Sequence, residues 1–101
     1  MTRSEFWLAF KARKYAVLCE TRGQHDQFQE SYADMLGREL DHIYHSNFPY
    51  ITCDYPTYYL LGWTRNGIST CRIPIITFQE WLEMTDEQED EIEIGNLSEV
   101  I

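Results

Sequence analysis

A chain of 101 residues, 44% hydrophobic and 15% aromatic, is long enough for one domain with a modest core and too short for two. Its formal net charge of −9, from 17 acidic and 8 basic residues, disfavours direct binding to nucleic acid or anionic membranes and favours basic protein partners. No apolar run has the length of a membrane span, no secretion signal is evident, and three cysteines without CxxC spacing indicate reduced thiols, so we expect a cytoplasmic protein.

The first elements are expected to be a short helix and a strand. Ser4 can cap the helix, and Phe6, Trp7 and Phe10 form an aromatic stripe along one side of it. In residues 14–21, apolar side chains fall on both faces of an alternating pattern, which indicates a largely buried strand.

A longer helix is predicted after Gly23. Five apolar residues at steps of three and four mark one face of it: Phe28, Tyr32, Met35, Leu36 and Leu40. Gly37 is unfavourable inside a helix by about 1 kcal/mol relative to alanine, so we expect either a close packing contact or an early helix end there.

The second half of the body shows the pattern of short strands. Aromatic and β-branched runs separated by proline and Asn-Gly predict strands at about 50–54, 57–64 and 68–73. Asn66-Gly67 indicates a hairpin turn, and Thr77 with Glu80 forms a capping box that opens a last helix. The predicted fold is α+β, with a small antiparallel sheet and helices packed on one face.

The charge is concentrated at the C-terminus. Residues 1–82 hold nine acids and all eight bases, a net −1, whereas residues 83–101 hold eight acids and no base. We divide the chain into a globular body, 1–85, and an acidic C-terminal segment, 86–101, which is either a solvated tail or an edge strand of the same domain. Ile92 and Ile94 alternate with Glu91 and Glu93, as in a strand with one buried face, so we expect order over 86–94.

These acids are the candidate partner-binding site. Carboxylates in an ordered strand or helix lie about 5–7 Å apart, a spacing of the same order as that of DNA phosphates, and a homodimer would double their number. The candidate residues are Glu83, Asp86, Glu87, Glu89, Asp90, Glu91 and Glu93. The alternative is that they serve solubility alone.

Catalytic and metal-binding motifs are weak. His42 and His45, with Cys53, give a possible metal set, but no second ligand pair follows at zinc-finger spacing. Cys19 lies in an apolar strand, where thiols are usually inert. The sequence contains no glycine-rich phosphate loop and no serine elbow, so we expect no enzyme activity, no cofactor and no metal.

The order of elements carries a resemblance. A strand "KYAVLCET", a helix, an aromatic region and a closing "IITFQEWLEM" segment, in a strongly acidic chain, resemble the small phage-encoded DNA-mimicking anti-restriction proteins of the Arn type from T-even coliphages. The resemblance implies a dimeric DNA mimic, made in the host cytoplasm, that occupies the DNA-binding surface of a restriction nuclease of the McrBC type. It implies no catalytic residue.

Two other functions compete with this one. An immunity protein that neutralises a nuclease toxin would need an equally acidic surface. A small metal-binding protein or enzyme would be built around His42, His45 and Cys53.

Overall fold

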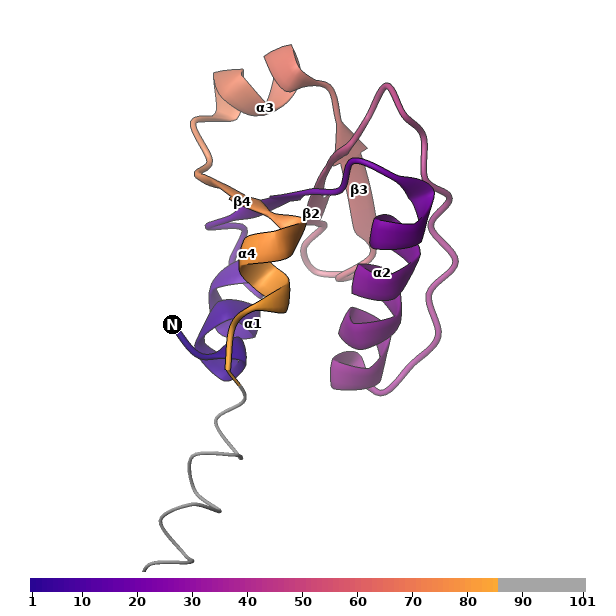
Figure 1. Cartoon of the computed structure of the whole chain (residues 1–101), viewed down its shortest axis with the longest axis vertical. Coiled ribbons are helices and arrows are strands. Elements are labelled where there is room, and N and C mark those ends of the chain that lie inside the picture. The colour runs from indigo at the N-terminus through magenta and orange to yellow at the C-terminus, as the bar shows by residue number, and fades with distance from the viewer. Residues whose placement is uncertain (86–101) are drawn as a thin grey trace, which may run out of the picture.

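The computed structural model describes residues 1–85 and confirms the α+β fold (Figure 1). Among these residues no helix is both long and apolar enough to cross a membrane. The elements in chain order are α1 Arg3–Lys11, β1 Ala16–Leu18, α2 Arg22–Leu36, β2 Tyr50–Cys53, β3 Leu60–Trp63, α3 Arg65–Cys71, β4 Ile75–Thr77 and α4 Phe78–Leu82. The acidic segment 86–101 lies outside the described residues, as does the order expected over 86–94.

The four strands form one sheet in the order β3-β2-β1-β4. β2 pairs antiparallel with both β1 and β3, but β4 pairs parallel with β1, with Val17 between Ile51 and Ile76. The sheet is therefore mixed, whereas the sequence led us to expect antiparallel strands only. The reason lies in the connection through α3, which carries the chain from one edge of the sheet to the other, where β4 enters in the direction of β1.

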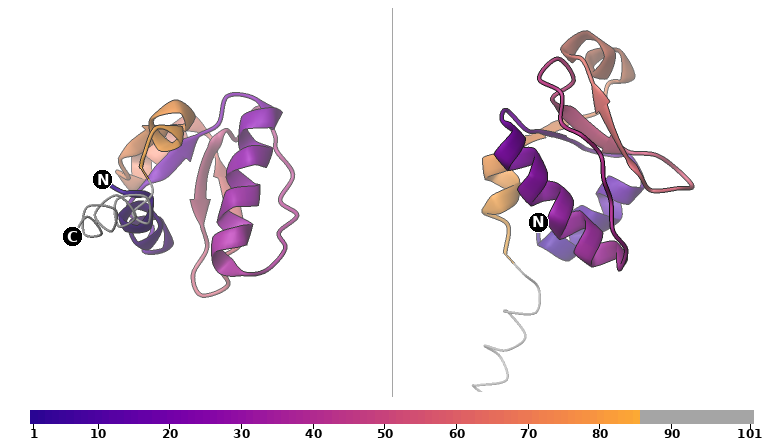
Figure 2. Two further views of the ribbon diagram at one scale, coloured as in Figure 1. Left: turned by 60° about the horizontal axis from the view of Figure 1, so that its bottom comes forward. Right: turned by 90° about the vertical axis from the view of Figure 1, so that its right-hand side faces the viewer.

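The core fills the space between one face of the sheet and three helices, α1, α2 and α4 (Figure 2). β1 contributes Val17, and Cys19 follows directly after the strand. The helices contribute a cluster of rings in edge-to-face and stacked contact, which is the favoured geometry for aromatic pairs. The buried rings of this cluster are Phe6, Phe10, Phe28, Tyr32, Phe78 and Trp81. The helices thus cover one face, as predicted, and the aromatic residues near the N-terminus form the stripe expected of α1.

The helix starts follow side-chain capping rules. Thr77 Oγ1 accepts from the Glu80 amide at 3.1 Å and Glu80 Oε1 accepts from the Thr77 amide at 2.9 Å, which confirms the predicted capping box of α4. In α1 the cap is Thr2 rather than Ser4, and Glu5 completes a second capping box. A threonine two residues ahead of the expected cap lengthens the helix without changing its buried face.

α2 ends at Gly37, which is its C-cap residue. Gly37 adopts φ 75°, a left-handed conformation that favours glycine, and this confirms the expected early end of the helix. After it, residues 37–49 contain no helix or strand and run back along α2 as an extended segment before entering β2 (Figures 1 and 2). We call residues 37–49 the return segment.

The predicted hairpin at Asn66-Gly67 and the strand at 68–73 are wrong. Both residues lie in the first turn of α3, where Thr64 Oγ1 accepts from the Gly67 amide at 3.0 Å, and Gly67 does not have a positive φ. The Asn-Gly pair was a plausible turn, but the threonine before it is an equally good helix cap and the structure uses the cap. The hairpin of this sheet joins β2 to β3 through residues 54–59.

Gly62 in β3 is needed for a close approach by the return segment. A Cβ atom at this position would lie 2.8 Å from the Phe48 carbonyl oxygen and 3.0 Å from Phe48 Cβ. Gly62→Ala should therefore lower the free energy of unfolding by about 1–3 kcal/mol, because the added methyl group would overlap Phe48 and force the return segment away from β3.

The matched control is Gly23→Ala in α2, where the nearest atom to the new methyl group is 3.9 Å away. This substitution should stabilise the protein by up to about 1 kcal/mol, because alanine favours the helix. Urea unfolding measures both, and equal effects of the two substitutions would contradict the close approach at Gly62.

Candidate acidic interface on helix α2

Of the seven predicted partner-binding acids, Glu83 alone lies within residues 1–85. It is the exposed C-cap residue of α4, and its Oε2 accepts from Gln79 Nε2 at 3.0 Å. Asp86, Glu87, Glu89, Asp90, Glu91 and Glu93 lie outside the described residues. The structure therefore gives one end of the predicted site and no arrangement for the rest.

A second group of acids lies on α2, outside the set of residues predicted from the sequence. Asp26, Glu30 and Asp34 are exposed and follow one another at four-residue steps, while Phe28 and Tyr32 are buried on the opposite side of the helix. Side chains four residues apart on a helix lie about 5–6 Å apart, so the three carboxylates form a row along the helix axis. We call these three residues the acidic row.

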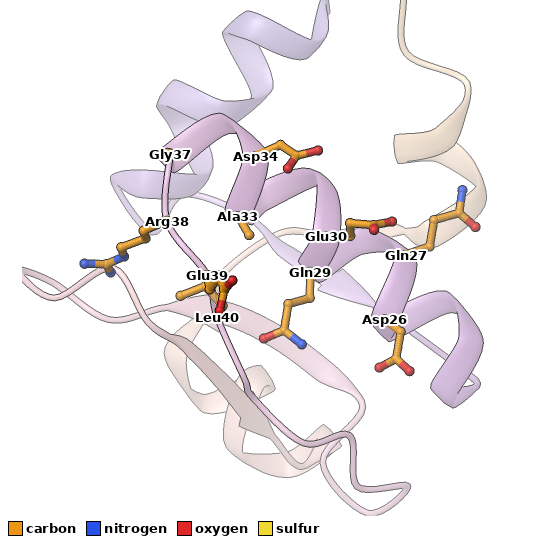
Figure 3. A pocket seen from close by; sticks show the side chains of 10 residues that line it. All are labelled: Asp26, Gln27, Gln29, Glu30, Ala33, Asp34, Gly37, Arg38, Glu39 and Leu40. Atoms are coloured by element: carbon orange, nitrogen blue, oxygen red, sulfur yellow. The ribbon is translucent and has the colours of Figure 1, made fainter.

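The acidic row borders a groove of about 730 Å³ between α2 and the start of the return segment. Figure 3 shows α2 forming one wall and the chain after Gly37 forming the other. Four acids and one base line this groove: Asp26, Glu30, Asp34 and Glu39, with Arg38. The groove is therefore strongly negative, although residues 1–82 as a whole are almost neutral.

The one basic residue of the groove has other partners. The Arg38 side chain points away from the acidic row (Figure 3), donates to the Thr57 carbonyl and lies over the Tyr59 ring, with Cζ 4.8 Å from the ring centroid. Arg22 lies 3.6 Å from Asp26 in an exposed pair, which contributes little. Glu30, Asp34 and Glu39 have no ion-pair partner within residues 1–85, so their charge is available to a partner.

The wall opposite α2 is held by a glutamine and two histidines. Gln29 Oε1 accepts from the His42 amide at 2.8 Å and Gln29 Nε2 donates to the His42 carbonyl at 3.0 Å. The ring nitrogens His42 Nδ1 and His25 Nε2 lie 2.8 Å apart, and His25 Nδ1 lies 2.9 Å from Asp26 Oδ1. These contacts place His42 next to α2, and they also give Asp26 a partner inside the protein.

The residues of the alternative metal set do not converge. His42 is bonded to His25, His45 Nδ1 accepts from the Asn47 amide at 3.1 Å, and the Cys53 thiol donates to the Phe10 carbonyl at 3.1 Å. Within residues 1–85 no group of three or more histidine, cysteine or carboxylate side chains is arranged to hold a metal ion. The part of the chain that the structure describes therefore supplies no ligand set for that alternative.

The buried thiols are poor nucleophiles. Burial raises the pKa of Cys19 to about 12, so this side chain stays protonated at physiological pH. Burial also raises the pKa of Cys53. The cysteine that could react most readily on grounds of exposure is Cys71, at the end of α3.

The spacing of its residues in the sequence is a signal for the acidic row, which the net charge of residues 1–82 does not reveal. Asp26, Glu30 and Asp34 stand at i, i+4 and i+8 on the predicted polar face of α2. Comparison with known proteins adds no family to this description: no family model, no curated protein and no solved structure matches the chain.

Proposed function

We propose that the protein is an acidic inhibitor that occupies the DNA-binding surface of a basic protein in the cytoplasm. The observation that supports this most directly is the acidic row, three exposed carboxylates, of which Glu30 and Asp34 have no ion-pair partner within residues 1–85. From Asp26 to Asp34 the helix rises about 12 Å. One strand of B-DNA carries a phosphate for about every 3.4 Å of axis, which gives three to four phosphates over the same length.

The acidic segment adds to the same property. Eight of the 17 acids follow residue 82, and none of the eight bases does. A partner that bound both the acidic row and the acidic segment would contact many carboxylates carried by one folded protein. A homodimer would present this set of carboxylates twice. The resemblance names the class of target, a host restriction nuclease of the McrBC type.

A competition experiment tests this function. A fluorescently labelled DNA duplex is bound to a purified nuclease of the McrBC type, and the inhibitor is titrated in while anisotropy is recorded. We expect stoichiometric displacement of the duplex. Because opposed charges are screened over about 8–10 Å, the apparent affinity should fall at least tenfold between about 50 and 200 mM salt.

Two results would count against the proposal. No displacement of the duplex would remove the restriction nuclease as the target, and an affinity that does not change with salt would remove the electrostatic basis. Binding to a nuclease toxin in the same assay, with no binding to the restriction nuclease, would favour an immunity protein instead.

A further inference from the structure

The contact between the return segment and α2 contains a chain of three ionisable side chains, Asp26, His25 and His42. His25 is fully buried, and both of its ring nitrogens have a partner: Nδ1 lies 2.9 Å from Asp26 Oδ1 and Nε2 lies 2.8 Å from His42 Nδ1. A carboxylate only accepts, so His25 carries a proton on Nδ1. When both rings are neutral, the bond between them requires His42 to donate from Nδ1 to the bare Nε2 of His25.

The return segment depends on side chains for its position. Between residues 39 and 48 no backbone–backbone hydrogen bond joins it to a helix or strand in the described body. The ends of the segment are fixed by Arg38, which donates to the Thr57 carbonyl, and by the Pro49 carbonyl, which accepts from the Cys19 amide at 3.0 Å. Between them, the polar contacts to the rest of the body are the two Gln29 bonds to His42, the His25–His42 bond, and the Tyr44 hydroxyl, which donates to the Cys19 carbonyl at 3.0 Å. Leu40 and Tyr44 also pack against the core.

The two histidines can share one added proton without losing their bond. One proton added to the pair still leaves one of the two facing nitrogens without a hydrogen, so that nitrogen can accept and the His25–His42 bond survives. A second proton leaves a donor on each of the two facing nitrogens, which are 2.8 Å apart, so the bond is lost and two positive charges meet.

The surrounding charges act in both directions. α2 provides Asp26 and Arg22, and the return segment provides Glu39, Asp41 and Tyr44. Tyr59, between β2 and β3, lines the same hollow as His42, and Cys19 and Glu20, which follow β1, lie beside Tyr44. Burial and the charge of His25 lower the pKa of His42, and Asp41 raises it by a smaller amount. The folded state therefore favours neutral His42.

We propose that Asp26, His25 and His42 form a pH-sensitive latch, which holds the return segment against α2 at neutral pH and releases it in mild acid. Because the pKa of His42 is lower in the folded protein than its ordinary 6.5, the latch is at full strength above pH 6.5. It weakens as the pH falls below that value, because the released segment binds the second proton more readily. Release opens one wall of the groove beside the acidic row. That consequence for partner binding rests on the proposed function, whereas the latch itself is a property of the free protein.

Hydrogen exchange of the free protein tests the latch. The His42 amide, which donates to Gln29 Oε1, reports on the return segment directly. Between about pH 8 and pH 5, its protection, corrected for the intrinsic pH dependence of exchange, should fall about tenfold or more, while amides of β1 and β2 keep theirs. His42→Asn retains a donor close to the Nδ1 position and cannot titrate, so this variant should lose the pH response.

The matched control is His45→Asn. His45 lies in the same segment and is exposed, but it is outside the chain of three, so the variant should keep the full response. Corrected protection that does not change with pH in the wild-type protein would overturn the latch, as would a response abolished by His45→Asn. Nitrogen-15 NMR of the wild-type rings provides a test that needs no variant: near pH 8 both His25 and His42 should carry their proton on Nδ1, and an Nε2–H form of either would overturn the proposal. Neither readout involves a partner, so failure of the latch and failure of the proposed function are separate results.

Discussion

Replacing six acids of the C-terminal segment with their amides should abolish competition with DNA while the body stays folded. The six residues are Asp86, Glu87, Glu89, Asp90, Glu91 and Glu93. If each charge contributes about 0.5 kcal/mol to the complex, their combined loss weakens binding by about a hundredfold. The anisotropy assay measures the affinity, and the midpoint of thermal unfolding shows whether the body is unaffected.

Removing charges from the groove that the acidic row borders should weaken binding in the same way, by a smaller factor. Glu30→Gln, Asp34→Asn and Glu39→Gln together remove three exposed charges from the groove, and by the same reasoning should weaken binding by about tenfold. Asp26 is left in place because it bonds to His25.

Two controls separate charge from shape at these positions. Glu30→Asp, Asp34→Glu and Glu39→Asp change side-chain length and keep every charge, so binding should be nearly intact. Glu20→Gln removes one exposed charge away from the groove and should have less effect than Glu30→Gln. If the six-amide and three-amide variants both compete with DNA as well as the wild-type protein does, the acids serve solubility and the proposed function is wrong.

Phe28→Ala should be the most damaging single substitution for stability. The Phe28 ring lies 5.0 Å from Trp81 and 5.3 Å from Phe10, measured between centroids, so it joins α2 to both α1 and α4. Loss of this fully buried ring should cost about 3–5 kcal/mol. Because a small domain has only about 5–15 kcal/mol of stability in total, the variant will be close to unfolding at room temperature.

Urea unfolding followed by tryptophan fluorescence measures this loss, since Trp81 is in contact with the ring that is removed. Leu8→Ala is the control, because Leu8 is also apolar and helical but is 71% exposed; it should cost less than about 0.5 kcal/mol. Equal losses for the two variants would show that the aromatic cluster does not hold the helices together.

Local rules predicted the parts of this fold that depend on neighbouring residues. The capping box of Thr77 and Glu80, the apolar face of α2 and the end of that helix at Gly37 each follow from residues within one or two turns. The sheet was harder to predict. β1 and β4 are three residues long, which is too short for a pattern to give direction, and their parallel pairing is decided by the path of the chain through α3. At Asn66-Gly67, the same residues are compatible with a hairpin turn and with the first turn of a helix, so the local sequence does not decide between them.

The candidate site was only partly accessible to sequence reasoning, for a related reason. The pairing of His25 with His42 spans 17 positions and requires the return segment to fold back along α2, which no local pattern encodes. The sequence drew attention to His42 and His45 as neighbours, whereas the structure pairs His42 with a histidine from another element. The acidic row, by contrast, could be predicted from the four-residue spacing of its members. The total charge of the body does not reveal it, because the basic residues elsewhere nearly cancel these acids.

The bridge between Thr2 and Thr85 decides where an added group can be placed on this protein. The Arg3 amide donates to the Thr85 carbonyl at 2.9 Å, and the Arg3 guanidinium donates to the Leu82 carbonyl at 3.1 Å and lies over the Trp81 ring. The two ends of the body are therefore fastened to each other. A purification tag or a fluorophore fused at Met1 is carried beside the point where the acidic segment begins, so a cationic tag there would compete with the partner for those carboxylates, and a fluorophore would report their binding without replacing any of them.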